Sequence, residues 1–134
     1  MIIAWNEAFD VGIPEIDAQH RDLIETFNRL ADTLQSGEGQ VTPLTIINEL
    51  TGKVKVHADY EENVMRTTGY SGSAAHAEEH RSFIRDIEDL SQRMLTTGKP
   101  RLQLGSLKIL GRRLIDHTCT GTDRDLVAHL KANR

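Results

Sequence analysis

The sequence predicts an all-α fold, an antiparallel up-down-up-down four-helix bundle with a short C-terminal extension. In four successive segments, apolar residues recur at alternating intervals of three and four positions, the spacing of a helix face buried in a bundle. Breaks that contain glycine, at 37–39, 69–72 and 98–100, separate the segments, and such short connections favour antiparallel neighbours. A chain of 134 residues is expected to form one domain, 1–134.

The first two segments show the buried face most fully. In the first it comprises Ile16, His20, Leu23, Phe27, Leu30 and Leu34. In the second it comprises Ile47, Leu50, Val54, His57, Glu61 and Val64. Thr42 and Pro43 are typical of a helix start, because threonine caps the first turn and proline fits the first helical position. Gly37 and Gly69 are expected to end these helices in a left-handed turn.

The third and fourth segments continue the same pattern. The third presents His76, His80, Phe83, Ile87, Leu90 and Met94, and Gly98 follows it as the expected helix end. The fourth presents Leu107, Leu110, Leu114 and His117. Residues 124–134 are expected to add a short fifth helix, in which His129 would lie at the surface.

The composition excludes several classes of protein. Sixteen Lys and Arg stand against 20 Asp and Glu, which gives a net charge of −4, and no basic run provides a nucleic-acid surface. The single cysteine, Cys119, cannot form an intramolecular disulfide. Neither a signal peptide nor a long apolar run is recognisable. We therefore expect a cytoplasmic protein without membrane insertion or nucleic-acid partners.

Five of the six histidines and one glutamate occupy positions that the pattern reserves for apolar residues. Burial of such groups without partners costs several kcal/mol each, roughly, so something must compensate for it. His76 and His80 lie four residues apart, as do His57 and Glu61, and this spacing lets both side chains of a pair reach one cation. In an antiparallel bundle these pairs meet His20 and His117 at one end.

The number of ligands in this layer predicts two metal ions. Five imidazoles and at least one carboxylate exceed what a single tetrahedral ion uses, whereas two ions that share a bridging carboxylate fit the number. Imidazole and carboxylate ligands suit iron, manganese, zinc or copper, and the residues alone do not choose among these metals.

Together these motifs resemble the bacterial hemerythrins. The resemblance rests on Trp5, the stretch VGIPEIDAQH at 11–20, His57-x3-Glu61, His76-x3-His80, and His117 followed by Gly121-Thr122-Asp123. It implies a non-haem centre of two iron ions, bridged by carboxylates and an oxo or hydroxo group, that binds dioxygen reversibly. Such a protein would carry, store or deliver oxygen.

Matching positions imply the role of each ligand. His76, His80 and His117 would bind one iron, His20 and His57 the other, and Glu61 and Asp123 would bridge them. Asp123 departs from the family spacing because it follows His117 by six residues instead of five. On a regular helix it would point away from the metals, so the chain must leave helical geometry, and Gly121 offers a place for this.

The surroundings of the centre are also expected from position. Leu23, Phe27, Leu114 and Thr118 are candidate walls of an oxygen pocket, and Thr118 and Cys119 would make it more polar. Arg113 and Thr118 stand where the family often has tryptophan and an aliphatic residue. Four carboxylates lie off the buried faces and are expected to be solvated or to orient ligands, namely Asp17, Glu62, Glu78 and Glu79.

Other functions remain as alternatives. The segment from His76 to His80 matches the inverted zinc-protease motif, with Glu79 as base, but leaves the other histidines unexplained. A ferritin-like oxidase would need two Glu-x-x-His motifs, which the sequence lacks. An oxygen or iron sensor with a separate signalling partner, or a di-iron protein that reacts with peroxide or nitric oxide, is the main alternative. We expect no enzyme beyond a minor oxidase or peroxidase-like side activity.

Overall fold

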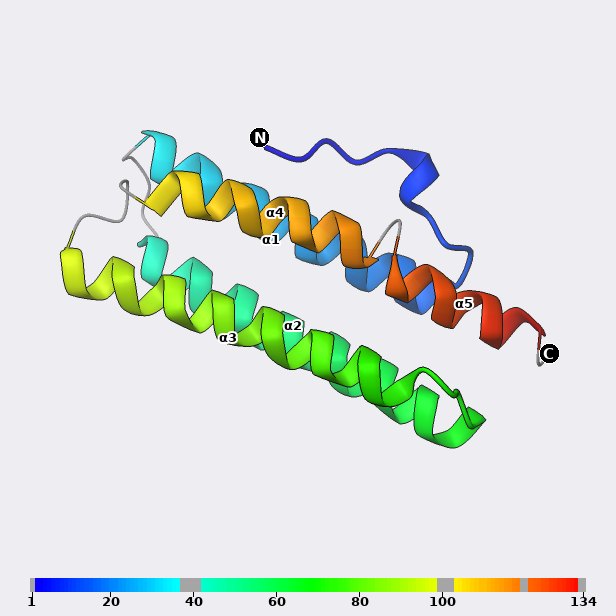
Figure 1. Cartoon of the computed structure of the whole chain (residues 1–134). Helices are drawn as coiled ribbons and strands as arrows, with labels where there is room; N and C mark the ends of the chain where they lie inside the picture. Colours follow the sequence, from blue (N-terminus) through cyan, green and yellow to red (C-terminus); the bar gives the residue numbers. More distant parts are fainter. Residues whose placement is uncertain (1, 37–41, 99–102, 119–120, 133–134) are drawn as a thin grey trace.

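The computed structural model describes residues 2–36, 42–98, 103–118 and 121–132, and in this part of the chain every regular element is helical. A short 3₁₀ turn, η1 (Glu7–Phe9), precedes the helices. These are α1 (Pro14–Ser36), α2 (Pro43–Thr68), α3 (Ser73–Thr97), α4 (Leu104–Thr118) and α5 (Thr122–Ala132). The predicted four-helix bundle with a C-terminal extension is confirmed (Figure 1).

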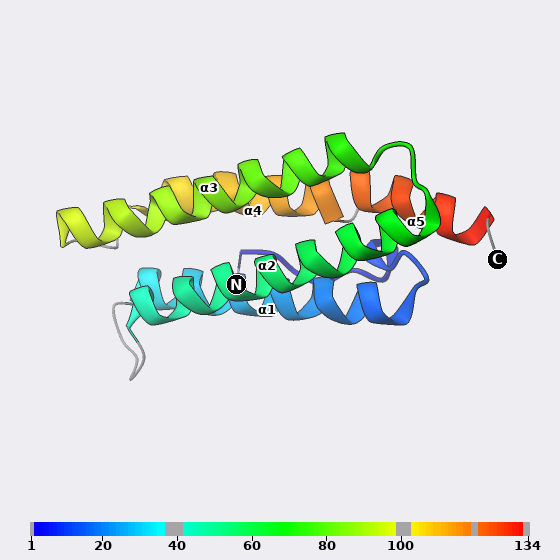
Figure 2. The same ribbon diagram turned by 90° about the horizontal axis from the view of Figure 1, so that it is seen from below.

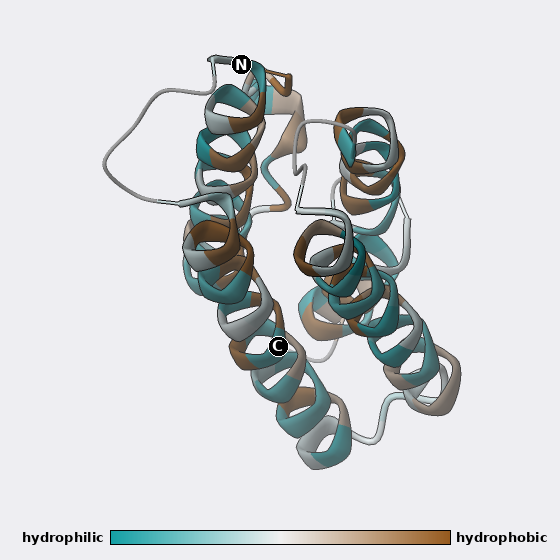
Figure 3. Cartoon of the chain, turned by 90° about the vertical axis from the view of Figure 1, so that its left-hand side faces the viewer, coloured by the Kyte–Doolittle hydropathy of each residue, from teal (hydrophilic) through white to brown (hydrophobic). Residues whose placement is uncertain are grey.

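The four long helices pack in chain order around one core. α1 lies against α2, α2 against α3, and α4 closes the bundle against both α3 and α1. Figure 2 shows the bundle from below, with α5 beyond the end of α4. Hydrophilic and hydrophobic residues alternate along each helix, as the pattern of threes and fours requires (Figure 3). No helix among the described residues is long and apolar enough to cross a membrane.

Helix ends follow the local chemistry of the sequence. The Thr42 side chain accepts a hydrogen bond from the Thr45 N–H at the start of α2, with Pro43 in the first turn. Gly69 and Gly98 end α2 and α3 in the left-handed conformation, at φ 68° and 62°. Both predicted ends are therefore confirmed. The break predicted at 37–39, and Pro100, lie outside the described residues.

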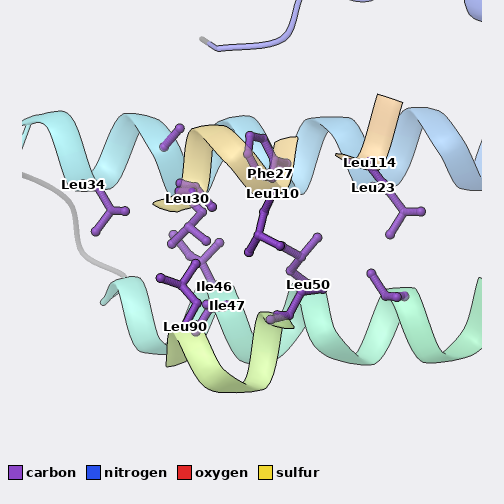
Figure 4. Packing of buried hydrophobic residues seen from close by; sticks show 14 of the residues in the cluster. Leu23, Phe27, Leu30, Leu34, Ile46, Ile47, Leu50, Leu90, Leu110 and Leu114 are labelled. Carbon is purple, nitrogen blue, oxygen red and sulfur yellow. The ribbon is translucent and has the colours of Figure 1, made fainter. Parts of the chain in front are cut away.

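The larger of two apolar clusters extends from Leu23 and Leu114, beside the histidines, to Leu34, and a smaller one comprises Val11, Ile13, Ile16 and Val127. Figure 4 shows Leu30, Leu34, Ile47 and Leu90 packed together between the helices, all with exposed fractions of 2% or less. The predicted buried faces are observed except at three positions, Val64, Phe83 and His117, which are only partly buried. At the end of α2, Met65, four residues after Glu61, takes the interior position in place of Val64.

The N-terminal segment is held along the bundle by polar contacts. The Asn28 side chain accepts hydrogen bonds from the Ile2 and Ile3 N–H groups and donates one to the Ile3 carbonyl at 2.6 Å. Asp17 accepts from the N–H groups of Val11 and Gly12, so it orders this loop and does not face the histidines.

Both ends of α5 contact the N-terminal segment. Lys131 donates to the Val11 carbonyl and Arg124 to the Ala8 carbonyl. His129, predicted to be solvated, is partly buried, with its Nε2 3.2 Å from the Thr68 hydroxyl and its ring 4.9 Å from that of Tyr70. These contacts fix the helix that carries Asp123.

The close approach of α1 and α4 gives a first testable prediction. A Cβ at Gly111 would lie 2.6 Å from Cζ of Phe27, a ring that is only 1% exposed and has no room to move. Gly111→Ala should therefore reduce the free energy of unfolding by about 1–3 kcal/mol in urea titrations. Gly105→Ala on the same helix, where a Cβ meets nothing within 4 Å, is the control and should not destabilise the protein. Equal stabilities of the two variants would contradict the prediction.

Candidate metal centre

All seven predicted ligands meet in one layer near the end of the bundle where α5 begins. His20 comes from α1, His57 and Glu61 from α2, His76 and His80 from α3, His117 from α4, and Asp123 from α5. His20, Glu61 and Asp123 are completely buried, and the most exposed side chain of the set, that of His117, is 12% accessible. The i,i+4 spacing on α2 and α3 explains why one helix supplies two groups to one layer.

The Asp123 carboxylate lies at the centre of the layer. Its Oδ2 is 2.8 Å from Nε2 of His20 and 3.1 Å from Nε2 of His57. Its Oδ1 is 2.8 Å from Nε2 of His76 and 2.9 Å from Nε2 of His117. One carboxylate therefore reaches imidazoles from all four helices of the bundle.

Glu61 makes a second, similar junction. Its Oε1 lies 3.0 Å from Nε2 of His57, 3.2 Å from that of His76 and 3.0 Å from that of His80. Both carboxylates thus face the same nitrogen, Nε2, of several imidazoles, which is the arrangement of ligands that share metal ions.

The five imidazoles divide into a group of three and a pair. The rings of His76, His80 and His117 lie within 4.5–5.0 Å of one another, centroid to centroid. His20 and His57 form the pair at 5.1 Å, and 6.0 Å separates His57 from His80. We call these sets the histidine trio and the histidine pair.

A break between α4 and α5 brings Asp123 into the layer. Helix α4 ends at Thr118, and α5 begins at Thr122, where the Gly121 carbonyl accepts from the Arg124 and Asp125 N–H groups. The departure from helical geometry that the six-residue spacing requires is therefore present. A Cβ at Gly121 would collide with the Asp116 carbonyl oxygen, so this turn needs glycine. Cys119 lies outside the described residues.

Polar side chains hold the outer nitrogen, Nδ1, of three imidazoles. Gln19 Oε1 lies 2.6 Å from that of His57, and Glu62 Oε2 lies 3.1 Å from that of His80. The Nδ1 of His117 meets both Glu79 Oε1 and Thr122 Oγ1 at 2.8 Å. Such contacts fix ring orientation and direct Nε2 inward.

Only part of this outer layer follows from the sequence pattern. Glu62 and Glu79 were among the carboxylates expected to be solvated or to orient ligands, and they orient ligands. Glu78 pairs with Arg81 and Arg85 at the surface instead. Gln19 and Thr122 were missed, because only the register between helices shows which histidine they reach.

The imidazoles and carboxylates of the cluster stabilise one another's charged forms. Burial lowers the pKa of His57 and His76, but the carboxylates of Glu61 and Asp123 outweigh it and raise these pKa values to about 10 and about 9. Burial raises the pKa of Glu61, yet the surrounding imidazoles, His57 first, lower it to about 2. The same balance, with His117 the leading partner, holds the pKa of Asp123 well below its ordinary value.

These shifts predict how the stability of the metal-free protein depends on pH. The raised pKa values of His57 and His76 stabilise the fold fully below about pH 6.5, their unfolded value, and this contribution is lost as pH rises towards 9–10. The lowered pKa of Glu61 stabilises the fold above about pH 4.5, and this contribution is lost as pH falls towards 2. Urea unfolding without metal should show stability lower at pH 9 than at pH 6 by on the order of a few kcal/mol. Equal or greater stability at pH 9 would contradict the assignment.

Three buried polar atoms in the layer have the chemistry that a cation satisfies. Glu61 Oε2 is buried without a hydrogen-bond partner in the described part of the chain, and Asp123 Oδ1 and His117 Nε2, 2.9 Å apart, form no hydrogen bond of good geometry there. Buried polar atoms are rarely left in this state, and a bound cation satisfies oxygen and imidazole nitrogen together. One donor atom from each of His57, Glu61, His80, His117 and Asp123 lies within 4.8 Å of the others. The residues therefore fit a metal centre.

A small cavity of about 20 Å³ adjoins this layer, room for about one water-sized molecule. Among its walls are three of the four predicted pocket residues, Leu23, Leu114 and Thr118. The fourth, Phe27, does not line it and packs against Gly111 instead. Val54 and Phe83 complete the apolar wall, and His57, His80 and His117 close it.

Two wall residues have further contacts. The Thr118 hydroxyl donates to the Leu114 carbonyl at 2.6 Å, which turns this hydrogen towards its own helix. Arg113, where the family often has tryptophan, lies over the Phe83 ring at 5.5 Å and pairs with Asp86. An arginine therefore covers the outside of the ring that lines the cavity.

The bundle and its buried cluster define a cation-binding helical protein of the histidine and carboxylate type. Residues 11–132 match the hemerythrin HHE cation binding domain. The chain belongs to the hemerythrin family.

Known relatives agree with this assignment. Bacteriohemerythrin of Pseudomonas aeruginosa strain LESB58 is 33% identical over 87 residues, which cover 65% of this chain and 56% of the relative. The match thus spans little more than half the length of that protein. Bacteriohemerythrin of Stenotrophomonas maltophilia is 28% identical over 132 residues, 98% of this chain and 84% of the relative. That of Clostridium acetobutylicum is 32% identical over 94 residues, covering 67% and 72%. No solved structure matches the chain.

Proposed function

We propose that the protein binds dioxygen reversibly at a centre of two iron ions and serves as an oxygen carrier, store or delivery protein. The observation that carries the proposal is the buried layer of five imidazoles and two carboxylates, divided into a trio and a pair. In this proposal the histidine trio holds one iron and the histidine pair the other. Glu61 and Asp123 reach both groups and act as bridges.

The unequal ligand number gives the two positions different tasks. Three imidazoles fill more coordination positions than two do, so the position held by His20 and His57 keeps a place for an external ligand. When bound, a pair of ferrous ions supplies the two electrons and the open position that reversible dioxygen binding requires.

The protein's own contribution is exclusion of water and protons. Leu23, Val54, Phe83 and Leu114 give the adjoining cavity an apolar wall, and its volume admits a diatomic molecule but no hydrated ion. Such a wall slows the escape of reduced oxygen species, which would leave the irons oxidised. Binding and release, without turnover of a substrate, follow from this environment.

Gas cycling tests the proposal. The reduced, iron-loaded protein should gain a visible absorption band on admission of air and lose it when argon replaces the air, over several cycles. Met protein, oxidised beforehand with ferricyanide, is the control and should not respond. A band that appears once and does not reverse, or no band at all in protein that contains two irons, would contradict oxygen binding.

A further inference from the structure

The polar groups behind the two sets of histidines differ in charge. Behind the histidine trio stand two carboxylates, Glu62 at Nδ1 of His80 and Glu79 at Nδ1 of His117. Behind the histidine pair stands one neutral amide, Gln19 at Nδ1 of His57. The Nδ1 of His20 is buried with no partner among the described residues, as is that of His76 in the trio.

The local sequence produces this inequality through the direction of neighbouring side chains. Glu61 and Glu62 are adjacent on α2, so one points into the layer and the other reaches outward to His80. Glu79 lies on α3 beside His80 and crosses to His117 on α4, where the Thr122 hydroxyl also meets Nδ1. The carboxylates therefore tie together three helices around the trio, and the pair receives no comparable charge.

An imidazole that donates its Nδ1–H to a carboxylate becomes a more basic ligand through Nε2 than one that donates to a neutral amide. A more basic, more negative ligand stabilises the higher oxidation state of a metal ion, and hydrogen bonding to ligands is an established control of reduction potential. The histidine trio contains two imidazoles whose Nδ1 meets a carboxylate, and the histidine pair contains none.

We propose that Glu62 and Glu79 lower the reduction potential at the trio relative to the pair, so that the trio position is oxidised first. The inference rests on the proposed function, since it assumes one iron at each set. Gln19 keeps the other position the easier to hold ferrous, which is the position with a place for an external ligand. These three side chains are positioning residues that act through the imidazoles.

Each of the two oxidation steps transfers a single electron. Each step removes one electron from one ferrous ion and passes it to a soluble one-electron oxidant such as ferricyanide, which becomes ferrocyanide. No bond between protein and metal needs to form or break.

A potentiometric titration without oxygen tests the proposal with charge changes in both directions. Glu79→Gln and Glu62→Gln should each raise the lower of the two potentials, with a shift of the oxidation equilibrium of about tenfold, about 59 mV for one electron. Gln19→Glu should lower the higher potential and bring the two steps together. Glu78→Gln, next to Glu79 but paired with Arg81 at the surface, is the matched control and should change neither potential.

Binding of cobalt(II) to the metal-free chain gives a second measurement that needs no iron chemistry. Glu62→Gln and Glu79→Gln should weaken one of two binding steps ten- to a hundredfold, and Gln19→Glu should strengthen the other. Thermal unfolding of each variant shows whether it remains folded.

The possible outcomes distinguish failure of this inference from failure of the proposed function. A parent protein that binds fewer than two irons would overturn both. Two irons whose potentials respond alike to Glu79→Gln and Glu78→Gln, or a Gln19→Glu change that moves the lower potential, would overturn this inference alone.

Discussion

Asp123→Ala is expected to abolish the two-iron centre, lowering bound iron from two per chain to one or fewer. Among the described residues, Asp123 is the one whose carboxylate lies within 3.1 Å of imidazoles from all four helices of the bundle. Its removal deletes a bridge and leaves four imidazoles without their shared partner. Metal analysis after reconstitution with ferrous iron under argon measures the loss.

Two further variants make this result interpretable. Asp125→Ala, two residues along α5 and exposed, should retain two irons. Asp123→Asn keeps the shape of the side chain, so it folds if the alanine variant does not, and its loss of charge should still reduce iron content. Full iron content in Asp123→Asn and Asp123→Ala alike would show that Asp123 is no ligand.

The second large effect is expected at the turn before α5. Gly121→Ala places a methyl group against the Asp116 carbonyl oxygen, a backbone atom that cannot rotate away. The turn must open, which moves Asp123 out of a layer where its oxygens lie 2.8–3.1 Å from four imidazoles. We expect iron content to fall as in Asp123→Ala, and the free energy of unfolding to fall by several kcal/mol, roughly, because a buried ion cluster loses a member.

The control for this change is the other alanine variant without a collision. Gly105→Ala should leave iron content and stability intact, since a Cβ there meets nothing within 4 Å. A Gly121→Ala protein with two irons and unchanged stability would mean that the six-residue spacing does not depend on this glycine.

The bundle was predictable because periodicity is a local property of sequence. Spacing of three and four marks the buried faces of α1 to α4, and helix-end chemistry at Thr42 and Gly69 marks their limits. The shift from Val64 to Met65 at the end of α2 was not predictable in this way. It depends on how far the helix turns against its neighbours.

The inward-facing ligands were predictable for the same reason, and the outer layer was not. A histidine on a buried face must point into the bundle whatever its exact neighbours are, and four-residue spacing pairs it with a second group. Gln19 on α1 reaches His57 on the neighbouring α2, and Thr122 reaches His117 across the break between α4 and α5. Neither pairing follows from a periodic pattern in the sequence. Asp123 was predictable only in part. Its spacing from His117 required a break in the helix, but the spacing did not show where the chain turns after that break.

Metal content tests the central claim most directly. The protein is purified, stripped of metal, reconstituted with ferrous iron under argon and freed of unbound ions, and iron, zinc, manganese and copper are counted per chain. The layer, with three imidazoles on one side, two on the other and two carboxylates between them, predicts two metal ions per chain, and the proposed function predicts that both are iron. One metal ion per chain, or a clear preference for zinc when both metals compete, would contradict it.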